Sequence, residues 1–429
     1  MPIIARTLLL VAGIVCIAGA DNWDRFRGPN GAGTADDKGV PVTFGPNKNV
    51  IWKVELPGTG NSSPVVWGKR LFLHSASKDG KLRTLQCLDT ADGKTLWQRS
   101  IPGIHLAIRA DSSFASSTPT TDGQAVYVSF WDGKDILVTA YDVQGEKLWS
   151  KNLGPFNSQH GAAASPILYK DRLILANDMD REDFTTKKPN ARPSMLVALD
   201  KRTGELVWET PREAERACYS APFLLQRPGR SEPELVVTST TAVTAYNLTS
   251  GTKLWEAKNW QENGVKAPLR TIATPALLGD VLCVCSGGDA GRFAVGLALP
   301  DAGKGDAPQR LWDNRKDFPY VASPLAHGEH FYFVNDVGFA GCYHARTGKR
   351  AWFERLADSG FHASPLLIDG KVYASSAAGE VFVFAAEPTY RLLARNELGE
   401  VVRATAAVAG SRLFIRGERN LYCFGKVAD

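Results

Sequence analysis

The chain is predicted to fold as an all-β propeller of eight blades, each a four-stranded antiparallel sheet. Three observations predict this fold. A phrase made of an Asp or Asn, a turn glycine and a tryptophan recurs along the 429 residues. A second phrase, a small residue followed by proline and an apolar run, alternates with the first. Both return at intervals of about 40 to 60 residues, which is the length of a propeller blade.

The first phrase places a tryptophan shortly after a tight turn. In its first full copy, Asp89 can bond the backbone of its own turn, and Gly93 supplies the positive φ that the turn needs. The indole that follows would then pack between neighbouring blades and bury a large area. We therefore predict a structural docking role for seven tryptophans: Trp52, Trp97, Trp149, Trp208, Trp255, Trp312 and Trp352.

The second phrase marks where each blade begins, because proline is tolerated at the first residue of a strand but not at central ladder positions. Its copies are Pro64, Pro119, Pro166, Pro222, Pro275, Pro324 and Pro365, with Ala406 in the eighth position. Turns such as Asp369-Gly370 between apolar runs predict the hairpins inside each unit. The count is eight blades, with seven as the alternative if the unit around Trp312 is an insertion.

The two ends of the chain are predicted to close the ring together. The last unit, from Ala406 to Phe424, has three strands, and residues 50–56 form a fourth strand without partners of their own. Joining them removes two exposed sheet edges. The seventh unit has Ala394 in the tryptophan position. We assign residues 50–427 to one propeller domain, and residues 21–49 to a segment that wraps the outside of the ring with Trp23 and Phe26 as anchors.

Residues 1–20 are predicted to be a signal peptide. Arg6 provides the positive region, an apolar stretch follows, and Ala18-Gly19-Ala20 is a small-x-small cleavage site. We expect cleavage after Ala20, a periplasmic or secreted mature chain, and no transmembrane span in it. Lipidation of Cys16 is the alternative. The formal net charge of +5 without a basic block gives no indication of nucleic-acid binding, and we expect a monomer.

The remaining cysteines do not form an obvious disulfide framework. Cys87, Cys342 and Cys423 occupy one equivalent third-strand position and are expected in the core. Cys283 and Cys285 share a strand face about 6.5 Å apart, which is near or past disulfide reach. Cys218 differs because it lies in a loop.

The loops that lead into each proline converge at one mouth of the central channel, which is where ligand sites gather polar groups from several blades. The residues that precede the prolines there include Asn61 and Ser116, with Asp111 and Phe361 nearby. The candidate cofactor-binding residues are Arg109, His160, Tyr219, Arg270, Tyr320, His362 and Arg403. The alternative is a solvated funnel. No catalytic residue is assigned.

Two Asn-Asp pairs and one charged loop are predicted to face the same mouth. Asn177-Asp178 and Asn335-Asp336 end second strands, where they could supply oxygen ligands for Ca²⁺ or simply cap turns. The loop from Asp178 to Ser194 carries several charges. Such a loop could be functional or merely mobile, and both readings stay open.

The repeated Asp-x-x-Thr-Gly-Lys-x-x-Trp phrase resembles the tryptophan-docking motif of the quinoprotein, PQQ-binding-like β-propeller superfamily. The opening Trp23-Asp24-Arg25-Phe26-Arg27-Gly28-Pro29-Asn30-Gly31 resembles exported bacterial PQQ-like repeat proteins. The resemblance covers residues 23 to 426 and is specific for the fold rather than for an activity. The superfamily includes alcohol and sugar dehydrogenases that use pyrroloquinoline quinone with Ca²⁺, and a non-enzymatic lipoprotein that assists outer-membrane assembly.

The leading interpretation is an exported, non-catalytic scaffold that binds an envelope protein or a small ligand at its loop face and uses no cofactor. The first alternative is a dehydrogenase dependent on pyrroloquinoline quinone and Ca²⁺. By analogy alone, the cofactor, metal and catalytic roles would fall to Arg403, Arg270, Asp111 and Asp178. The adjacent Cys-Cys pair that those alcohol dehydrogenases place over the cofactor is missing from this sequence. The second alternative is a glycan hydrolase or lyase with paired carboxylates among Asp111, Asp178, Asp289 and Asp336.

Overall fold

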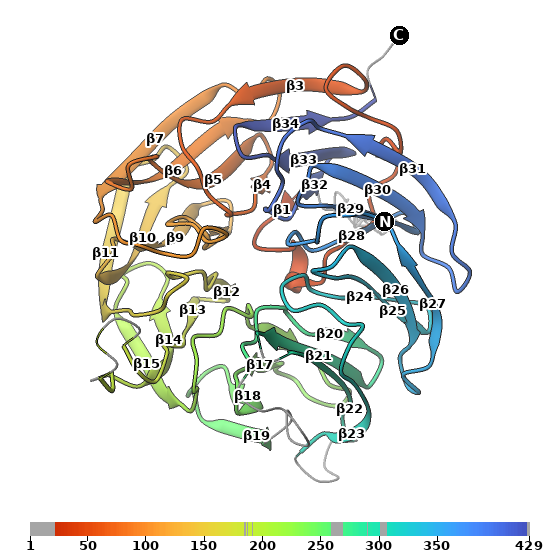
Figure 1. Cartoon of the computed structure of the whole chain (residues 1–429). Coiled ribbons are helices and arrows are strands. Elements are labelled where there is room, and N and C mark those ends of the chain that lie inside the picture. Colours follow the sequence, from red (N-terminus) through yellow and green to blue (C-terminus); the bar gives the residue numbers. More distant parts are fainter. Residues whose placement is uncertain are drawn as a thin grey trace, which may run out of the picture.

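Eight β-sheets arranged radially form a closed ring (Figure 1). The computed structural model describes residues 22–183, 186, 188–190, 192–258, 269–289, 291–300 and 307–426. The predicted signal peptide, with Cys16 and Ala20, lies outside the described residues, as do four positions of the Asp178–Ser194 loop. None of the described residues forms a helix long and apolar enough to cross a membrane.

Each blade runs from an inner strand at the channel to an outer strand at the rim. Blades one to four contain β4 (Val65–Trp67), β5 (Arg70–Ala76), β6 (Leu82–Asp89), β7 (Thr95–Pro102); β8 (Thr120–Thr121), β9 (Ala125–Trp131), β10 (Asp135–Asp142), β11 (Lys147–Pro155); β12 (Ile167–Tyr169), β13 (Arg172–Asn177), β14 (Ser194–Asp200), β15 (Leu206–Arg212); and β16 (Phe223–Leu225), β17 (Glu234–Thr238), β18 (Ala242–Asn247), β19 (Lys253–Lys258).

Blades five to eight continue in the same order around the ring. They contain β20 (Ala276–Leu278), β21 (Val281–Gly288), β22 (Gly291–Ala298), β23 (Gln309–Asn314); β24 (Leu325–His327), β25 (His330–Val334), β26 (Phe339–His344), β27 (Arg350–Arg355); β28 (Leu366–Ile368), β29 (Lys371–Ser375), β30 (Glu380–Ala385), β31 (Leu392–Glu397); and β32 (Ala407–Ala409), β33 (Arg412–Arg416), β34 (Asn420–Phe424). The N-terminal segment adds β1 (Asn22–Trp23), η1 (Pro29–Gly31), β2 (Thr34–Ala35) and β3 (Val50–Glu55).

The predicted blade count and closure are confirmed. The unit around Trp312 is a full sheet, β20 to β23, so the seven-blade alternative is wrong. Strand β3 pairs antiparallel with β34 and supplies the fourth strand of blade eight. Every inner strand begins one residue after the proline, or after Ala406 in the last blade, because the position that cannot donate to the ladder lies just before it.

The tryptophans join neighbouring blades at the outer rim, as predicted. The indole N–H of Trp149 donates to the carbonyl of Lys201 in the next blade at 2.9 Å, and Gly204 of that turn lies against the ring, where a Cβ would stand 2.5 Å from it. Five others make the equivalent bond to the next blade's turn: Trp52 to Thr90, Trp97 to Val143, Trp208 to Leu248, Trp312 to Ala345 and Trp352 to Glu387. We call these six contacts the outer belt.

Two junctions depart from the outer belt. Trp255 is buried but donates to the Glu234 carboxylate of its own blade at 2.5 Å. Blade seven has Ala394 in place of tryptophan, and there Phe44 of the N-terminal segment packs between the blades. The Phe44 ring lies 4.6 Å from that of Phe424, and its backbone N–H donates to the side chain of Asn396. A residue distant in sequence thus fills the place of the missing indole.

A second set of repeated contacts joins the blades at the inner rim. The hydroxyl of the residue before the proline accepts the backbone N–H of the equivalent residue in the preceding blade. Five such bonds, each 2.9 or 3.0 Å long, run from Ser63 to Thr118, Thr118 to Ser165, Thr274 to Ser323, Ser323 to Ser364 and Ser364 to Thr405. We call these five contacts the inner belt; the sequence analysis treated these positions only as small residues.

The N-terminal segment does not simply wrap the outside of the ring, and that prediction is corrected. Strand β1 pairs with the inner strand β4, and β2 pairs with the inner strand β28, so residues 22–35 occupy the central channel (Figure 1). The buried guanidinium of Arg25 donates to the carbonyl of Pro222 in blade four, and that of Arg27 to Pro324 in blade six. Only the later part, around Phe44, reaches the outer strands.

Trp23 anchors the segment as expected, although from inside the channel, with 1 % of its surface exposed. Gly28 adopts φ of +65°, and a Cβ there would lie 2.4 Å from the Trp23 ring, so no other residue fits this turn without rearrangement. The six described cysteines are buried and unbridged, and Cys87, Cys342 and Cys423 lie on third strands, as predicted.

Candidate functional site

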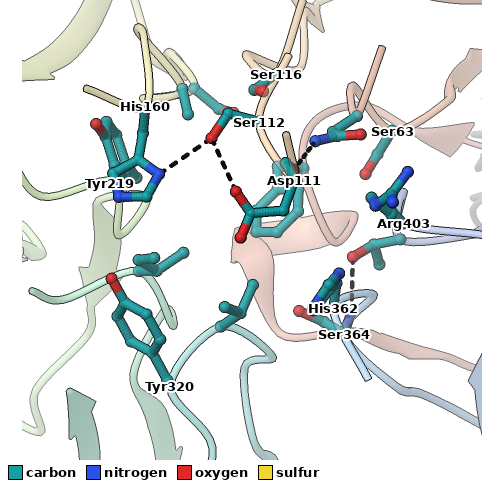
Figure 2. A pocket seen from close by; sticks show the side chains of 17 residues that line it. Ser63, Asp111, Ser112, Ser116, His160, Tyr219, Tyr320, His362, Ser364 and Arg403 are labelled. Carbon is teal, nitrogen blue, oxygen red and sulfur yellow. Dashed lines mark hydrogen bonds between the residues drawn. The ribbon is translucent and has the colours of Figure 1, made fainter. Parts of the chain in front are cut away.

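A cavity of about 190 Å³ opens at the mouth of the channel. Five of the seven predicted cofactor-binding residues line it together: His160, Tyr219, Tyr320, His362 and Arg403 (Figure 2). Asn61, Asp111 and Ser116 also line it, as the loop analysis expected. Phe26 lines it too, contributed by the segment that fills the channel. The mouth is therefore a pocket backed by the N-terminal segment.

The other predicted residues lie outside this lining. Arg109 lines an adjoining cavity of about 360 Å³ that shares Asn61, Ser112 and Arg403 with the first. Its guanidinium is 3.7 Å from the Asp111 carboxylate, and both side chains are half exposed. Arg270 is buried and binds both carboxylate oxygens of Asp180, at 3.0 and 3.2 Å. Phe361 is fully buried in the core and does not reach the cavity.

His160 is held in the wall by a serine. Its Nδ1 lies 3.0 Å from Ser112 Oγ, and its Nε2 lies 3.3 Å from the Gln159 amide. Burial, helped by the charge of Arg270, lowers the pKa of His160 to about 4, so the imidazole is neutral at neutral pH. The Asp111 carboxylate approaches Ser112 at 3.4 Å rather than the imidazole. The histidine thus lacks the carboxylate partner of a catalytic triad and is a weak base.

His362 and Arg403 form the opposite wall. Burial lowers the pKa of His362, with the Asp336 charge opposing this shift and the nearby Arg403 charge adding to it. Tyr219 is buried and its hydroxyl is 2.8 Å from Ser158 Oγ, and burial raises its pKa far above the usual range. At neutral pH the imidazoles and phenols of the pocket are uncharged, so the charge at the mouth comes from arginine and Asp111.

The two Asn-Asp pairs have structural partners. Asp336 accepts the backbone N–H groups of Tyr320 and Val321 and binds Arg292 at 3.1 Å, so it fixes the loop that carries Tyr320 into the pocket. Asn335 accepts the amides of Val337 and Phe339. The Asn335-Asp336 pair therefore caps turns, which is one of the two roles predicted for it.

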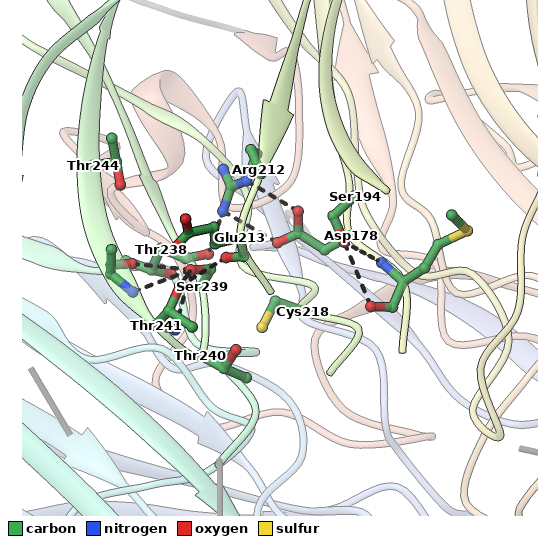
Figure 3. Close-up of polar contacts among 12 residues, drawn as sticks. Asp178, Ser194, Arg212, Glu213, Cys218, Thr238, Ser239, Thr240, Thr241 and Thr244 are labelled. Atoms are coloured by element: carbon green, nitrogen blue, oxygen red, sulfur yellow. Dashed lines mark hydrogen bonds and ion pairs between the residues drawn. The ribbon is translucent and has the colours of Figure 1, made fainter. Parts of the chain in front are cut away.

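Asp178 instead forms a buried ion pair with Arg212 of the same blade, blade three (Figure 3). The two pairs of atoms are 3.0 and 3.1 Å apart, and Arg212 also donates to the carbonyl of Thr238 in blade four. Burial raises the pKa of Asp178 to about 6 against the opposing charge of Arg212. With its oxygens facing a guanidinium, Asp178 is not placed to bind a cation.

The four residues proposed for a cage for pyrroloquinoline quinone and Ca²⁺ do not come together in the cavity. Of the four residues cast for it, Arg270 and Asp178 are held in ion pairs and only Asp111 and Arg403 line the cavity. Among the described residues, Asp111 is the one carboxylate of that lining, and no cluster of three or more acidic, His or Cys groups occurs. Of the four acids considered for glycan cleavage, the described lining again contains Asp111 alone.

Sequence reasoning missed several lining residues. Ser63, Ser165, Ser364 and Thr405 line the pocket from the position before each proline. The repeat itself carries that signal, because an equivalent position in every blade faces the same channel. Phe26 had no such signal, since its segment was assigned to the outside.

Comparisons with known proteins agree on the fold. The PQQ_2 family model, described as Outer membrane protein assembly factor BamB, matches residues 35–164, 103–222 and 134–388. The crystal structure of BamB from Moraxella catarrhalis superposes with a TM-score of 0.62 at 14 % identity, covering 88 % of this chain and 99 % of that one. A europium-containing methanol dehydrogenase superposes at 0.57 and 10 % identity, covering 94 % and 98 %.

One curated relative is an enzyme. A polyvinylalcohol dehydrogenase from a Pseudomonas species is 26 % identical over 218 residues, which is 49 % of this chain and 32 % of the relative. The chain thus matches about a third of that protein's length. The structural neighbours are too distant in sequence to show more than a shared fold.

Proposed function

This chain belongs to the PQQ-like β-propeller repeat family, and from that membership we propose that it is an exported binding protein whose mouth pocket receives a ligand without transforming it. The ligand is a component of the cell envelope, either a small molecule or a protein segment that reaches into the pocket. The family description, an outer-membrane assembly factor, supports an envelope setting.

The observation that carries the proposal is the composition of the pocket. It gathers hydrogen-bonding side chains from several blades around one space, among them Asn61, His160, Tyr320, His362 and Arg403. Such convergence is typical of a binding site. Its one described carboxylate is not placed to assist His160, so the pocket offers recognition more readily than proton transfer.

A second candidate is a quinone-dependent dehydrogenase, which the polyvinylalcohol dehydrogenase relative favours. A thermal-unfolding titration of the mature chain with pyrroloquinoline quinone plus Ca²⁺ separates the two, because a ligand of the native state raises the unfolding midpoint. The binding proposal predicts no saturable shift and no dye reduction with alcohols, sugars or polyvinyl alcohol. A saturable shift with dye reduction would replace it by the dehydrogenase.

The binding role itself is tested with size-fractionated envelope extract. At least one fraction should raise the unfolding midpoint of the mature chain, and the effect should disappear in Ala163→Phe, which fills the pocket. Ala91→Phe, at an exposed turn far from the mouth, is the matched control. If no fraction gives a shift that depends on Ala163, the proposal is wrong. The fraction's size tells a small ligand from a protein.

A further inference from the structure

The junction of blades eight and one presents two buried donors to the pocket. Ser63 is 1 % exposed, and its hydroxyl has no hydrogen-bond partner among the described residues. The buried Nε of Arg403 likewise has none within the described part of the chain. Both residues line the cavity (Figure 2). Buried donors are nearly always satisfied in native proteins. Other buried groups, such as the Thr274 hydroxyl and the Arg416 Nε, also have no partner among the described residues, but Ser63 and Arg403 line the same cavity. From this shared position we infer an acceptor that the pocket receives from outside.

Ser63 is unpaired because the inner belt is interrupted at this junction. By the pattern of the other blades, its hydroxyl would accept the backbone N–H of Thr405. Arg416 spans the junction instead, donating to the carbonyls of Ser62 and His74 at 3.0 and 2.8 Å. The hydroxyl of Ser63 is thereby released from the belt, and Ser63 lines the pocket.

Arg403 differs from three other arginines of this face. Arg109 lies near Asp111, Arg270 binds Asp180 and Arg292 binds Asp336. Within the described residues, Arg403 has no carboxylate partner closer than 4.0 Å. An ionised carboxylate is the strongest acceptor for a guanidinium N–H, and the planar fork matches its two oxygens.

The other lining residues indicate the chemical class of the ligand. Serine hydroxyls and the Asn61 amide surround the space, and Phe26 and Tyr320 add aromatic surface. These groups suit a molecule with several hydroxyls on an apolar ring. Among the described residues of the lining, Arg403 is the one arginine, which suits a monoanion better than a phosphate dianion. The volume of about 190 Å³ is below the roughly 300–1,000 Å³ of drug-sized sites, so the bound part is small.

We propose that the pocket binds a sugar acid, with its carboxylate at Arg403 and Ser63 and its hydroxyl groups at the serines and Asn61. This inference rests on the proposed binding function and names its ligand class. A free uronic acid and the terminal uronic acid of a glycan present the same chemistry.

The test is calorimetric titration of the mature chain with D-glucuronate, D-glucose and inorganic phosphate. Glucuronate should bind, while glucose and phosphate should bind much more weakly or not at all. Arg403→Gln should weaken glucuronate about thirtyfold, because one partner of a charged pair is removed. Ser63→Ala, which keeps the charge and the packing, should weaken it about fivefold. Arg391→Gln, at an exposed arginine that pairs with Glu387 just before the outer strand β31, should leave the glucuronate affinity unchanged.

Equal binding of glucose, or glucuronate affinity unchanged in both Arg403→Gln and Ser63→Ala, would overturn the sugar-acid assignment. Tighter binding of an oligoglucuronide than of the monomer would identify a glycan end as the source, and equal binding a free acid. If glucuronate does not bind while an extract fraction still gives a shift in unfolding midpoint that depends on Ala163, only the proposed ligand class is wrong. If both fail, the binding function itself is wrong.

Discussion

Neighbouring blades are joined at the outer and at the inner rim by hydrogen bonds in which the side chain has opposite roles, as donor or as acceptor. At the outer rim a side chain donates, as Trp149 does to the backbone of the next blade. At the inner rim the backbone donates, and a side chain of the next blade accepts, as Thr118 does from Ser63. The outer contact also buries a large ring, whereas the inner one involves a small hydroxyl. The outer belt therefore carries most of the packing energy, and the inner belt sets how the blades meet at the mouth.

Both belts of repeated hydrogen bonds are interrupted at the fourth blade. Trp255 bonds within its own blade, and Ala221 stands where the inner belt needs a hydroxyl. Buried charged groups replace the missing contacts there. Arg212 crosses from blade three to the Thr238 carbonyl, and Arg227 reaches Pro300 of blade five. A repeat is thus dispensable at a junction where an arginine spans the same gap.

Removing an outer-belt indole should have the largest effect. Trp149→Ala should lower the free energy of unfolding by about 3–5 kcal/mol, because the ring leaves a cavity and the Lys201 carbonyl loses its donor. Urea unfolding followed by circular dichroism measures this. Leu148→Ala, with the neighbouring side chain 52 % exposed, should change it by less than about 0.5 kcal/mol. Equal effects of the two would contradict a structural outer belt.

Phe44→Ala tests whether a residue from the N-terminal segment replaces the missing indole of blade seven. The buried ring contacts Phe424, so its loss should lower the free energy of unfolding by about 3 kcal/mol. Limited proteolysis should then cut the segment faster than in the wild type. Val337→Ala, at a position 58 % exposed, serves as the control. A Phe44 variant as stable and as resistant as that control would show that blades seven and eight hold together without it.

Acid should destabilise the inner rim through His74. Burial lowers its pKa from 6.5 to about 3, and its Nδ1 lies 3.2 Å from the Ser117 carbonyl of the next blade. Above pH 6.5 the residue is neutral in both folded and unfolded chains, so stability is fully retained. As the pH falls below 6.5, the unfolded chain takes up a proton that the folded chain does not, which costs roughly 2 kcal/mol by pH 5.

The measurement is the urea midpoint between pH 7 and 5. His74→Gln should reduce the slope and leave the part contributed by His160 and His362, whose pKa values burial also lowers. The exposed His327→Gln should leave the slope as in the wild type. A wild-type midpoint that stays constant over this range would show that the buried imidazole is not held neutral.

Single hydroxyls of the inner belt should have a smaller effect. Thr118→Val keeps the shape but leaves the Ser63 amide without an acceptor, so about 1–2 kcal/mol should be lost. Thr249→Val, at an exposed turn, is the control. If both variants unfold at the same urea concentration, the inner-belt bonds contribute nothing to stability.

The smallest expected effect is a gain. Ala221→Ser restores the hydroxyl that the repeat lacks and gives the Ser165 amide an acceptor, which should stabilise the chain by about 0.5–1 kcal/mol. Ala273→Ser, one position too early in its blade, should not stabilise it. A loss of stability in Ala221→Ser would mean that blade four meets blade three in a different register from the other junctions.

The parts of this structure that follow the repeat could be predicted from the sequence, and the parts that break it could not. Tryptophan is rare and bulky, so its recurrence indicates a specific contact, and all six outer-belt bonds fall on predicted residues. Serine before proline is common in turns, so the inner belt was not recognised. The path of residues 22–35 depends on long-range pairs, such as Arg25 with Pro222, which no local pattern encodes.

For the pocket, too, the sequence predicted some features and not others. Loop position placed His160, Tyr219, Tyr320, His362 and Arg403 at the mouth, because equivalent loops of a ring must converge. Position alone could not tell that Arg270 is held by Asp180, since that contact depends on the path of the long loop after Asp178. Nor could it show that Ser63 is released from its belt by Arg416.

Hydrogen exchange of the mature chain, measured with and without D-glucuronate, tests whether the mouth pocket is the ligand-binding site. The ligand should slow exchange in the mouth loops and leave the outer-belt turns unchanged. These loops are residues 59–64, 109–116, 158–165, 360–364 and 401–405. Protection that is confined to the mouth loops, and that is lost in Arg403→Gln, would establish the mouth pocket as the binding site. Protection at the outer rim, or no protection at saturating glucuronate, would show that the mouth pocket does not bind this ligand.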